Sequence, residues 1–223
     1  MTAQTTAAAP TVAPAAVCDA LVLRTLKECL ASGLGHESRT RLAADLAAVG
    51  AQGPGALDSR FPAAGRVYGR GPLPGWSGWS TEDAVRTVLL AQLPLEGKDL
   101  ADEAARHYHH GDAAERRGVL RALAFLPVGA YGLELTDDAL RTNDDRLIAA
   151  ALGPYAKVHL DQYRWRQAVL KCLFTGIPLA KVAGLHERRD AELARMAAGF
   201  AAERRAAGRP IPADLWLVDA YES

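Results

Sequence analysis

The chain is poor in the residues that mark several classes of protein. Its 223 residues include only three cysteines, and aromatic side chains make up 6% of it. So few cysteines, in an odd number, exclude a disulfide-built secreted domain and indicate a reducing compartment. Lys and Arg number 26, as do Asp and Glu, so no net charge attracts nucleic acid or an anionic membrane surface. We therefore expect a cytoplasmic protein that does not bind nucleic acid.

Long apolar runs are missing as well. Residues 1–18 carry no charged side chain. Polar residues and two prolines interrupt this stretch, and no Lys or Arg precedes an apolar core as in a signal peptide. Elsewhere the charge-free stretches are far shorter than the ~20 residues that a membrane-spanning helix needs. We predict a flexible tail over residues 1–15 and no transmembrane segment.

Alanine, in contrast, is abundant: it fills 45 positions. Alanine is the best helix former and a poor strand former. Apolar residues recur at helical spacing through most of the chain, with Gly or Pro where the periods stop. No stretch alternates apolar and polar residues with the β-branched enrichment of a strand. The sequence predicts an all-α fold, and we favour a HEAT-like α-solenoid array of antiparallel helices.

We expect one domain with three parts after the tail. Residues 16–49 are predicted as an N-terminal pair of helices, and residues 80–218 as the helical body. Residues 50–79 hold eight Gly and four Pro, which predicts a loop. Trp76 and Trp79 in this loop favour packing over the body, as a lid would, rather than a solvated linker.

Within the body, two helix starts are marked by capping pairs, Ser80 with Asp83 and Asp112 with Glu115. Further along, a helix is predicted over about 136–152.

The segment 138–178 carries the candidate binding site. Arg141, Thr142 and Asn143 lie in the middle of the predicted helix or at a break in it, because Thr and Asn side chains tend to bond the backbone. A clear amphipathic helix over about 161–175 then brings Trp165, Gln167 and Lys171. Two interpretations stay open: a ligand site, or a buried polar network that fixes the register of the helices.

Metal binding and catalysis find little support in the sequence. His107 and His110 are three residues apart on one predicted helix face, which can bring two imidazoles near one metal ion, but a third ligand is missing. The macrodipole at the end of that helix also favours histidine. No phosphate-binding or nucleophile motif is present. We predict no catalytic residue, no metal and no cofactor. An enzyme that uses His159 or an Asp138–Arg141 pair for acid–base chemistry is the alternative.

Pairs of adjacent arginines, such as Arg116–Arg117, have acidic residues within a few positions. Solvated helix faces with salt bridges explain them better than a phosphate-binding track.

Six strings in the second two thirds of the chain carry a family resemblance: PGWSGWSTEDAVRTVLL at 74–90, ALRTND at 139–144, GPY at 153–155, WRQAVLKCLFTGIPL at 165–179, GLHERRDAELARM at 184–196 and AERRAAGRPIPADLW at 202–216. In this order, over roughly residues 72–217, they resemble the EboA family of bacterial proteins, which the ebo gene clusters encode. The chain departs from the family pattern at Asp138, where a Glu is usual. It also departs at Gly153 and Ala156, in place of Asn and Pro, and at Arg166, in place of Asn.

The resemblance implies a cytoplasmic protein that works beside other ebo-cluster proteins, a membrane prenyltransferase homologue among them. Its implied role is the traffic or export of a secondary-metabolite precursor, as a non-enzymatic binding or adaptor protein. The alternatives are an enzyme acting on an aromatic or prenylated intermediate and a helical scaffold that docks ebo-cluster enzymes. The ligand residues that we predict are Trp76, Trp79, Arg141, Thr142, Asn143, Trp165, Gln167, Lys171, Glu187 and Arg188.

Overall fold

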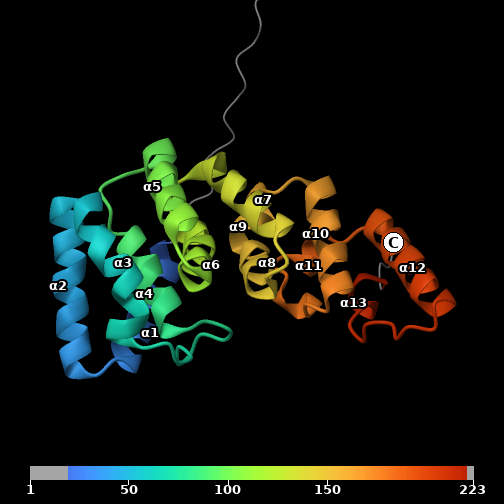
Figure 1. Ribbon diagram of the computed structural model, residues 1–223, viewed down its shortest axis with the longest axis horizontal. Coiled ribbons are helices and arrows are strands. Elements are labelled where there is room, and N and C mark those ends of the chain that lie inside the picture. The colour runs from blue at the N-terminus through green and yellow to red at the C-terminus, as the bar shows by residue number, and fades with distance from the viewer. Residues whose placement is uncertain (1–19, 220–223) are drawn as a thin grey trace, which may run out of the picture.

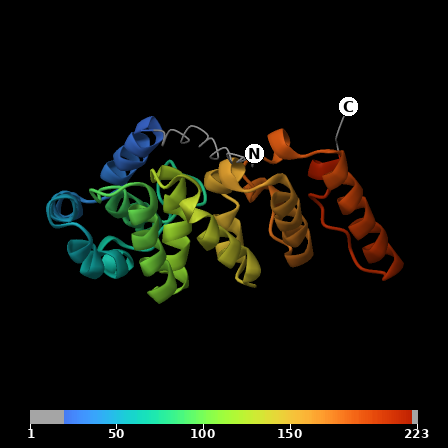
Figure 2. The ribbon, with the colours of Figure 1, turned by 90° about the horizontal axis from the view of Figure 1, so that it is seen from above.

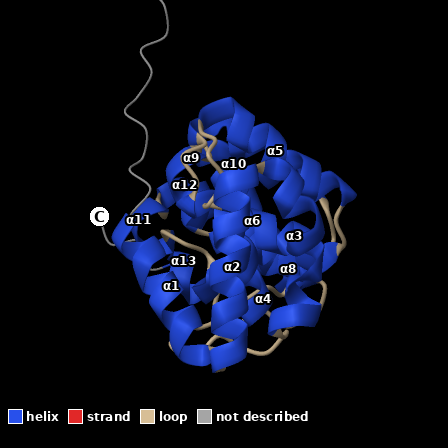
Figure 3. Ribbon diagram, turned by 90° about the vertical axis from the view of Figure 1, so that its left-hand side faces the viewer, coloured by secondary structure: helices blue, strands red, loops and turns tan. Residues whose placement is uncertain are grey.

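The computed structural model describes residues 20–219, and over that range every regular element is a helix (Figures 1 and 3). The α-helices are α1 (Ala20–Gly33), α2 (His36–Gln52), α3 (Pro54–Tyr68), α4 (Thr81–Leu90), α5 (Gly97–His110), α6 (Ala113–Ala122), α7 (Leu133–Arg141), α8 (Asp145–Ala151), α9 (Pro154–His159), α10 (Gln162–Thr175), α11 (Leu185–Arg188), α12 (Ala191–Ala206) and α13 (Trp216–Asp219). The all-α prediction is confirmed. The tail predicted over residues 1–15 lies outside the described residues.

The helices follow one another along the long axis, from α1–α3 at one end to α12 and α13 at the other (Figures 1 and 2). None of the helices in the described part of the chain is long and apolar enough to cross a membrane. Two helix starts follow from the predicted capping boxes. Ser80 and Asp83 cap α4 reciprocally, and Asp112 and Glu115 do the same for α6.

The Gly/Pro-rich loop predicted over residues 50–79 is wrong for most of its length, because α2 continues to Gln52 and α3 fills Pro54–Tyr68. Gly53, at a φ of 67°, makes the sharp turn between the two helices. Pro54 then stands in the first turn of α3, where its missing N–H costs nothing. Pro62 lies inside the helix. A proline inside a helix removes a backbone hydrogen bond and destabilises the helix. Here the buried apolar face of α3 offsets that loss, with Leu57, Phe61, Ala64 and Tyr68.

Helix α4 is the centre of the N-terminal half and packs against α1, α2, α3 and α6. Nine of its ten residues are buried, and three of these are charged: Glu82, Asp83 and Arg86. Arg86 Nη1 lies 3.2 Å from Glu82 Oε2. From α6, Arg117 bonds both acids at 3.0 Å, and Arg121 Nη1 lies 2.9 Å from Asp83 Oδ2. These buried charges are therefore all paired, as burial requires.

Two glycines in the neighbouring helices make room for this buried charge network. A Cβ on Gly65 of α3 would overlap the Glu82 carboxylate, and a Cβ on Gly118 of α6 would lie 2.7 Å from Arg86 Cδ. The flanking helices can therefore approach α4 closely only because these two positions lack a side chain.

The hydrophobic core forms two clusters that meet at α8. The first extends from Leu26 to Tyr155 and includes residues of α1–α6. The second extends from Ile148 to Val218. Leu147 belongs to the first cluster and its neighbour Ile148 to the second. Helix α8 therefore joins the two halves.

We predict that Gly118→Ala lowers the free energy of unfolding by about 1–3 kcal/mol, because the new methyl group overpacks Arg86. Gly199→Ala is the matched control. Gly199 is also inside a helix, but its Cβ would meet nothing within 4 Å. That substitution should raise stability by about 0.5–1 kcal/mol, as Gly→Ala in a helix ordinarily does. Urea denaturation of both variants measures the two effects, and stabilisation by Gly118→Ala would contradict the role given to that glycine.

Candidate functional site

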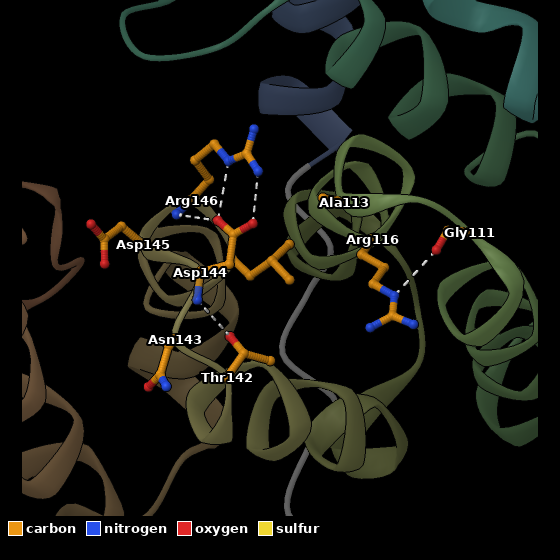
Figure 4. A pocket seen from close by; sticks show the side chains of 9 residues that line it. Gly111, Ala113, Arg116, Thr142, Asn143, Asp144, Asp145 and Arg146 are labelled. Atoms are coloured by element: carbon orange, nitrogen blue, oxygen red, sulfur yellow. Dashed lines mark hydrogen bonds and ion pairs between the residues drawn. The ribbon is translucent and has the colours of Figure 1, made fainter.

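An open groove lies between the N-terminal ends of α6 and α8 (Figure 4). Its volume is about 900 Å³, and two stretches of chain line it, residues 111–116 and 142–147. The second stretch includes Thr142 and Asn143, two of the residues that the sequence places in a ligand site. The groove is the structure's best candidate for a binding site.

The groove exists because the helix breaks after Arg141. The single helix predicted over about 136–152 is wrong, and the break considered at Arg141–Asn143 is confirmed, since α7 ends at Arg141 and α8 starts at Asp145. Thr142 Oγ1 donates to the Ala139 carbonyl at 2.8 Å, and Asp144 Oδ1 accepts from the Arg146 amide at 2.9 Å. These side chains take the backbone groups that a continuous helix would have used. The chain therefore leaves one helix and starts another within three residues.

Lys171, on α10, holds this break from a distant part of the chain. Its Nζ donates to the Leu140 and Thr142 carbonyls, at 2.6 Å each. These carbonyls lie at the C-terminal end of α7, where the helix dipole favours a cation. Lys171 thus supports the backbone of the loop that carries Thr142 and Asn143, as the network interpretation of this segment expects.

Arg116 is the cation that the groove offers. Its Nε donates to the Gly111 carbonyl at 3.2 Å, and its guanidinium carbon lies 5.4 Å from the centre of the Tyr108 ring. Neither of its Nη atoms has a hydrogen-bond partner among the described residues. Figure 4 shows the guanidinium reaching into the space between the two lining stretches.

The other charges of the groove are paired or turned away. Arg146 donates two hydrogen bonds to Asp144, from Nε to Oδ1 at 3.1 Å and from Nη2 to Oδ2 at 2.8 Å. This pairing lowers the pKa of Asp144. The Asp145 carboxylate points away from Arg116 (Figure 4). Arg116 is therefore left with donors for an anionic group, while the exposed Asn143 lies on the other lining stretch.

Arg141 lies just before the groove and does not line it. Its side chain is 69% exposed and forms an ion pair with Asp138 at 3.3 Å. The other oxygen of Asp138 accepts a bond from the Tyr108 hydroxyl at 2.9 Å. The Asp138–Arg141 pair considered for acid–base chemistry therefore exists, but outside the groove.

Trp165 and Arg188 lie together in the C-terminal core. Trp165 is fully buried, and the Arg188 guanidinium stacks on its ring at 4.8 Å. Arg188 makes five hydrogen bonds, to the carbonyls of Ala156, Lys157 and Leu160 and twice to Gln162 Oε1. A guanidinium has five N–H groups. Arg188 therefore caps the C-terminal end of α9 and keeps no donor for a ligand.

Gln167 and Glu187 lie on the surface, away from the groove lining. Lys157 Nζ donates to Glu187 Oε1 at 2.7 Å and lowers the pKa of that carboxyl. The ligand residues predicted in the C-terminal part of the chain are thus not gathered into one cavity.

Trp76 and Trp79 pack against the first core cluster. Their rings meet edge to face, and Trp79 meets Phe125 in the same way. Arg121 stacks on Trp79 at 5.1 Å and donates to the Gly78 carbonyl at 2.7 Å. Arg121 is at the C-terminal end of α6, whereas the groove is at the N-terminal end. Arg121 lies five residues beyond Arg116, which is about 7.5 Å along the helix.

His159, the other acid–base candidate, does not line the groove. Its ring stacks on Tyr155 at 4.5 Å, and burial lowers its pKa. The two acid–base candidates therefore occupy different places, and neither faces the groove.

Comparison with known proteins places the chain in a family. A family model described as metabolite traffic protein EboA matches residues 69–219. The chain belongs to the EboA family. No curated protein and no solved structure matches it significantly.

The EboA match covers the whole groove and the tryptophan segment. Helices α1–α3 lie before the matched residues. The ALRTND string that carries part of the EboA resemblance supplies the end of α7, the break and the cap of α8. In this family member the string therefore shapes the groove wall through its backbone as well as its side chains.

Arg116 and Arg146 are groove residues that sequence reasoning missed. Arg116 belongs to an arginine pair that was interpreted as a solvated, salt-bridged face. Its neighbour Arg117 does form such bridges, with the buried acids of α4, while Arg116 faces the groove. The one available signal was the position of Arg116 in the first turns of a capped helix.

Asp190 completes the polar network around Arg188. It caps α12 by accepting from the Leu193 amide at 2.9 Å, and it also accepts bonds from Arg166 and Gln162. The hydrogen bond from Arg166 lowers the pKa of Asp190 most. Together with the bonds from Leu193 and Gln162, it holds that pKa at about 2.

We predict that Asp190→Asn, which keeps a good helix cap, lowers the free energy of unfolding at pH 7 by about 1–2 kcal/mol. Because the folded pKa lies below the ordinary value of 3.8, this contribution is complete above that value and is lost as the pH falls toward 2. Urea denaturation of both proteins between pH 7 and pH 3 tests this. A difference that stays constant over the range would contradict it.

Proposed function

We propose that this EboA-family protein is a non-enzymatic binding or adaptor protein in metabolite traffic, and that the groove between α6 and α8 holds the polar end of a metabolite. The family supports the role in traffic. The observation that carries the binding role is Arg116, whose two Nη atoms have no partner among the described residues and lie in a groove of about 900 Å³.

The chemistry of the groove favours an anionic group on the metabolite. A guanidinium offers parallel N–H donors that match a carboxylate or a phosphate. The Tyr108 ring beneath it and the Gly111 carbonyl keep the guanidinium in place. Asn143 adds an exposed amide that can both donate and accept. A carboxylate or phosphate is therefore the expected contact.

The shape of the groove favours holding a molecule over transforming it. Its volume is within the range of small-molecule sites. It is open to solvent, whereas active sites generally exclude water around the reacting atoms. An open site in which Arg116 keeps both Nη atoms unpaired among the described residues fits a protein that binds a metabolite and passes it on.

We propose further that the helical array is HEAT-like and that the protein works in the cytoplasm. Its partners would be other ebo-cluster proteins, a membrane prenyltransferase homologue among them, and its cargo a secondary-metabolite precursor. The succession of helices along the long axis supports the array (Figure 1). The free thiols of Cys29 and Cys172 support a reducing compartment.

We predict that the protein purified from its own host carries a small molecule with a carboxylate or phosphate, which is seen in native mass spectra and lost on denaturation. Arg116→Gln should weaken binding by about tenfold or more and so lower the bound fraction, because a hydrogen bond to a charged group contributes about 1.5–3 kcal/mol. Arg205→Gln, on the exposed surface of α12, is the matched control and should leave the bound fraction unchanged.

Equal occupancy in Arg116→Gln and the wild type would exclude the groove as the binding site. A protein that carries no small molecule and is purified with a protein partner would indicate a docking scaffold. Conversion of the bound molecule by the pure protein would refute the non-enzymatic role.

A further inference from the structure

A second polar cluster lies between α3 and α5, away from the groove. Asp58 comes from α3, and Glu103 and His107 come from α5. One potential ligand atom from each of the three side chains lies within 4.8 Å of the other two. His107 Nε2 is 3.1 Å from Glu103 Oε1 and 3.9 Å from Asp58 Oδ1.

His107 is held firmly in this cluster. Its side chain is only 8% exposed, and its ring lies 4.6 Å from the ring of Phe61. Glu103 is four residues earlier on the same helix, so the two side chains share a face. The pair of imidazoles considered in the sequence does not form here, because His110 is exposed and its Nδ1 lies 2.8 Å from the Arg106 carbonyl.

We propose that Asp58, Glu103 and His107 bind a first-row divalent metal ion of the Zn²⁺ class, with water completing the coordination shell. One imidazole nitrogen and two carboxylate oxygens form a donor set that suits Zn²⁺, whereas Mg²⁺ prefers oxygen ligands alone. With bonds of about 2.1 Å in a tetrahedral shell, neighbouring ligand atoms lie about 3.4 Å apart. The distances from His107 Nε2 to the two carboxylates fall on either side of that value.

Arg106 supplies an independent sign that the cluster attracts a cation. Its Nη2 donates to both carboxylates, Asp58 Oδ1 and Glu103 Oε1. The guanidinium thus occupies the position between the two acids that a metal ion would take. The Arg106 side chain is 42% exposed, so it can turn into solvent when a doubly charged ion arrives. Arg106 is therefore an internal competitor of the metal, and its removal should strengthen metal binding.

The proposed metal site shares no residue with the groove and does not rest on the function proposed for the groove. Asp58 precedes the residues that the EboA model matches, so the family match does not cover the whole cluster. Failure of metal binding would leave the metabolite-binding proposal as it stands, and the reverse holds as well.

The test is a titration of the full-length, metal-free protein with Zn²⁺ against a chromophoric chelator. We expect one Zn²⁺ per chain. Asp58→Asn and His107→Gln should each weaken binding by about tenfold or more, and Arg106→Gln should strengthen it several-fold. His110→Gln, which removes an exposed histidine from the same helix, is the matched control and should bind as the wild type does.

A thermal melt gives a second readout. At one Zn²⁺ concentration the Tm of the wild type and of Arg106→Gln should rise more than that of Asp58→Asn, since a bound ion stabilises only the folded state and a weaker site stabilises it less. Asp58 is 53% exposed, so this variant decides the matter even if His107→Gln fails to fold. The proposal is overturned if neither the wild type nor Arg106→Gln binds Zn²⁺ with saturation. It is also overturned if Asp58→Asn binds as tightly as the wild type, if His110→Gln loses as much affinity as Asp58→Asn, or if Mg²⁺ competes equally.

Discussion

The rest of the structure depends on the buried charge network of α4. Arg117 and Arg121 extend from α6 to Glu82 and Asp83, so that α4 and α6 are held in one register. Removing Glu82 would leave the buried Arg86 without its acidic partner, and an unpaired buried charge costs several kcal/mol. The same Arg121 fixes the tryptophan segment through Gly78 and Trp79. Since α6 also forms one wall of the groove, the charge network determines the position of that wall.

Helix starts could be predicted from the sequence where local chemistry decides them, and the α4 and α6 caps show this. The errors arose where distant residues decide. The sequence leaves the break after Arg141 open, and Lys171 stabilises it from 31 residues away by its bond to the Leu140 carbonyl. In α3, the apolar spacing of Leu57, Phe61 and Ala64 was present in the sequence, but its glycines and Pro62 obscured it. Burial against α4 outweighs those unfavourable residues, and burial is a tertiary effect.

The candidate site was harder to predict than the fold, because a side chain's chemistry is the same whether it serves a ligand or the protein itself. Arg188 was expected to meet a ligand, yet its acceptors are the Ala156, Lys157 and Leu160 carbonyls at the end of a helix that the sequence did not indicate. From the sequence alone, Arg116 and Arg117 look alike, as one salt-bridged pair. Adjacent residues on a helix point about 100° apart, so only the packing of α6 could reveal that one faces the core and the other the groove.

Helix α5 links the groove to the polar cluster at α3. His107 belongs to the cluster, while the next residue, Tyr108, supplies the ring beneath Arg116. Tyr108 is fully buried, and its hydroxyl is bonded to Asp138 of α7, so it cannot move without its helix. Any change at Asp58, Glu103 and His107 that shifted α5 would therefore shift the support of the Arg116 guanidinium. The N-terminal helices, although outside the EboA match, thus help to determine the geometry of a groove that lies within it.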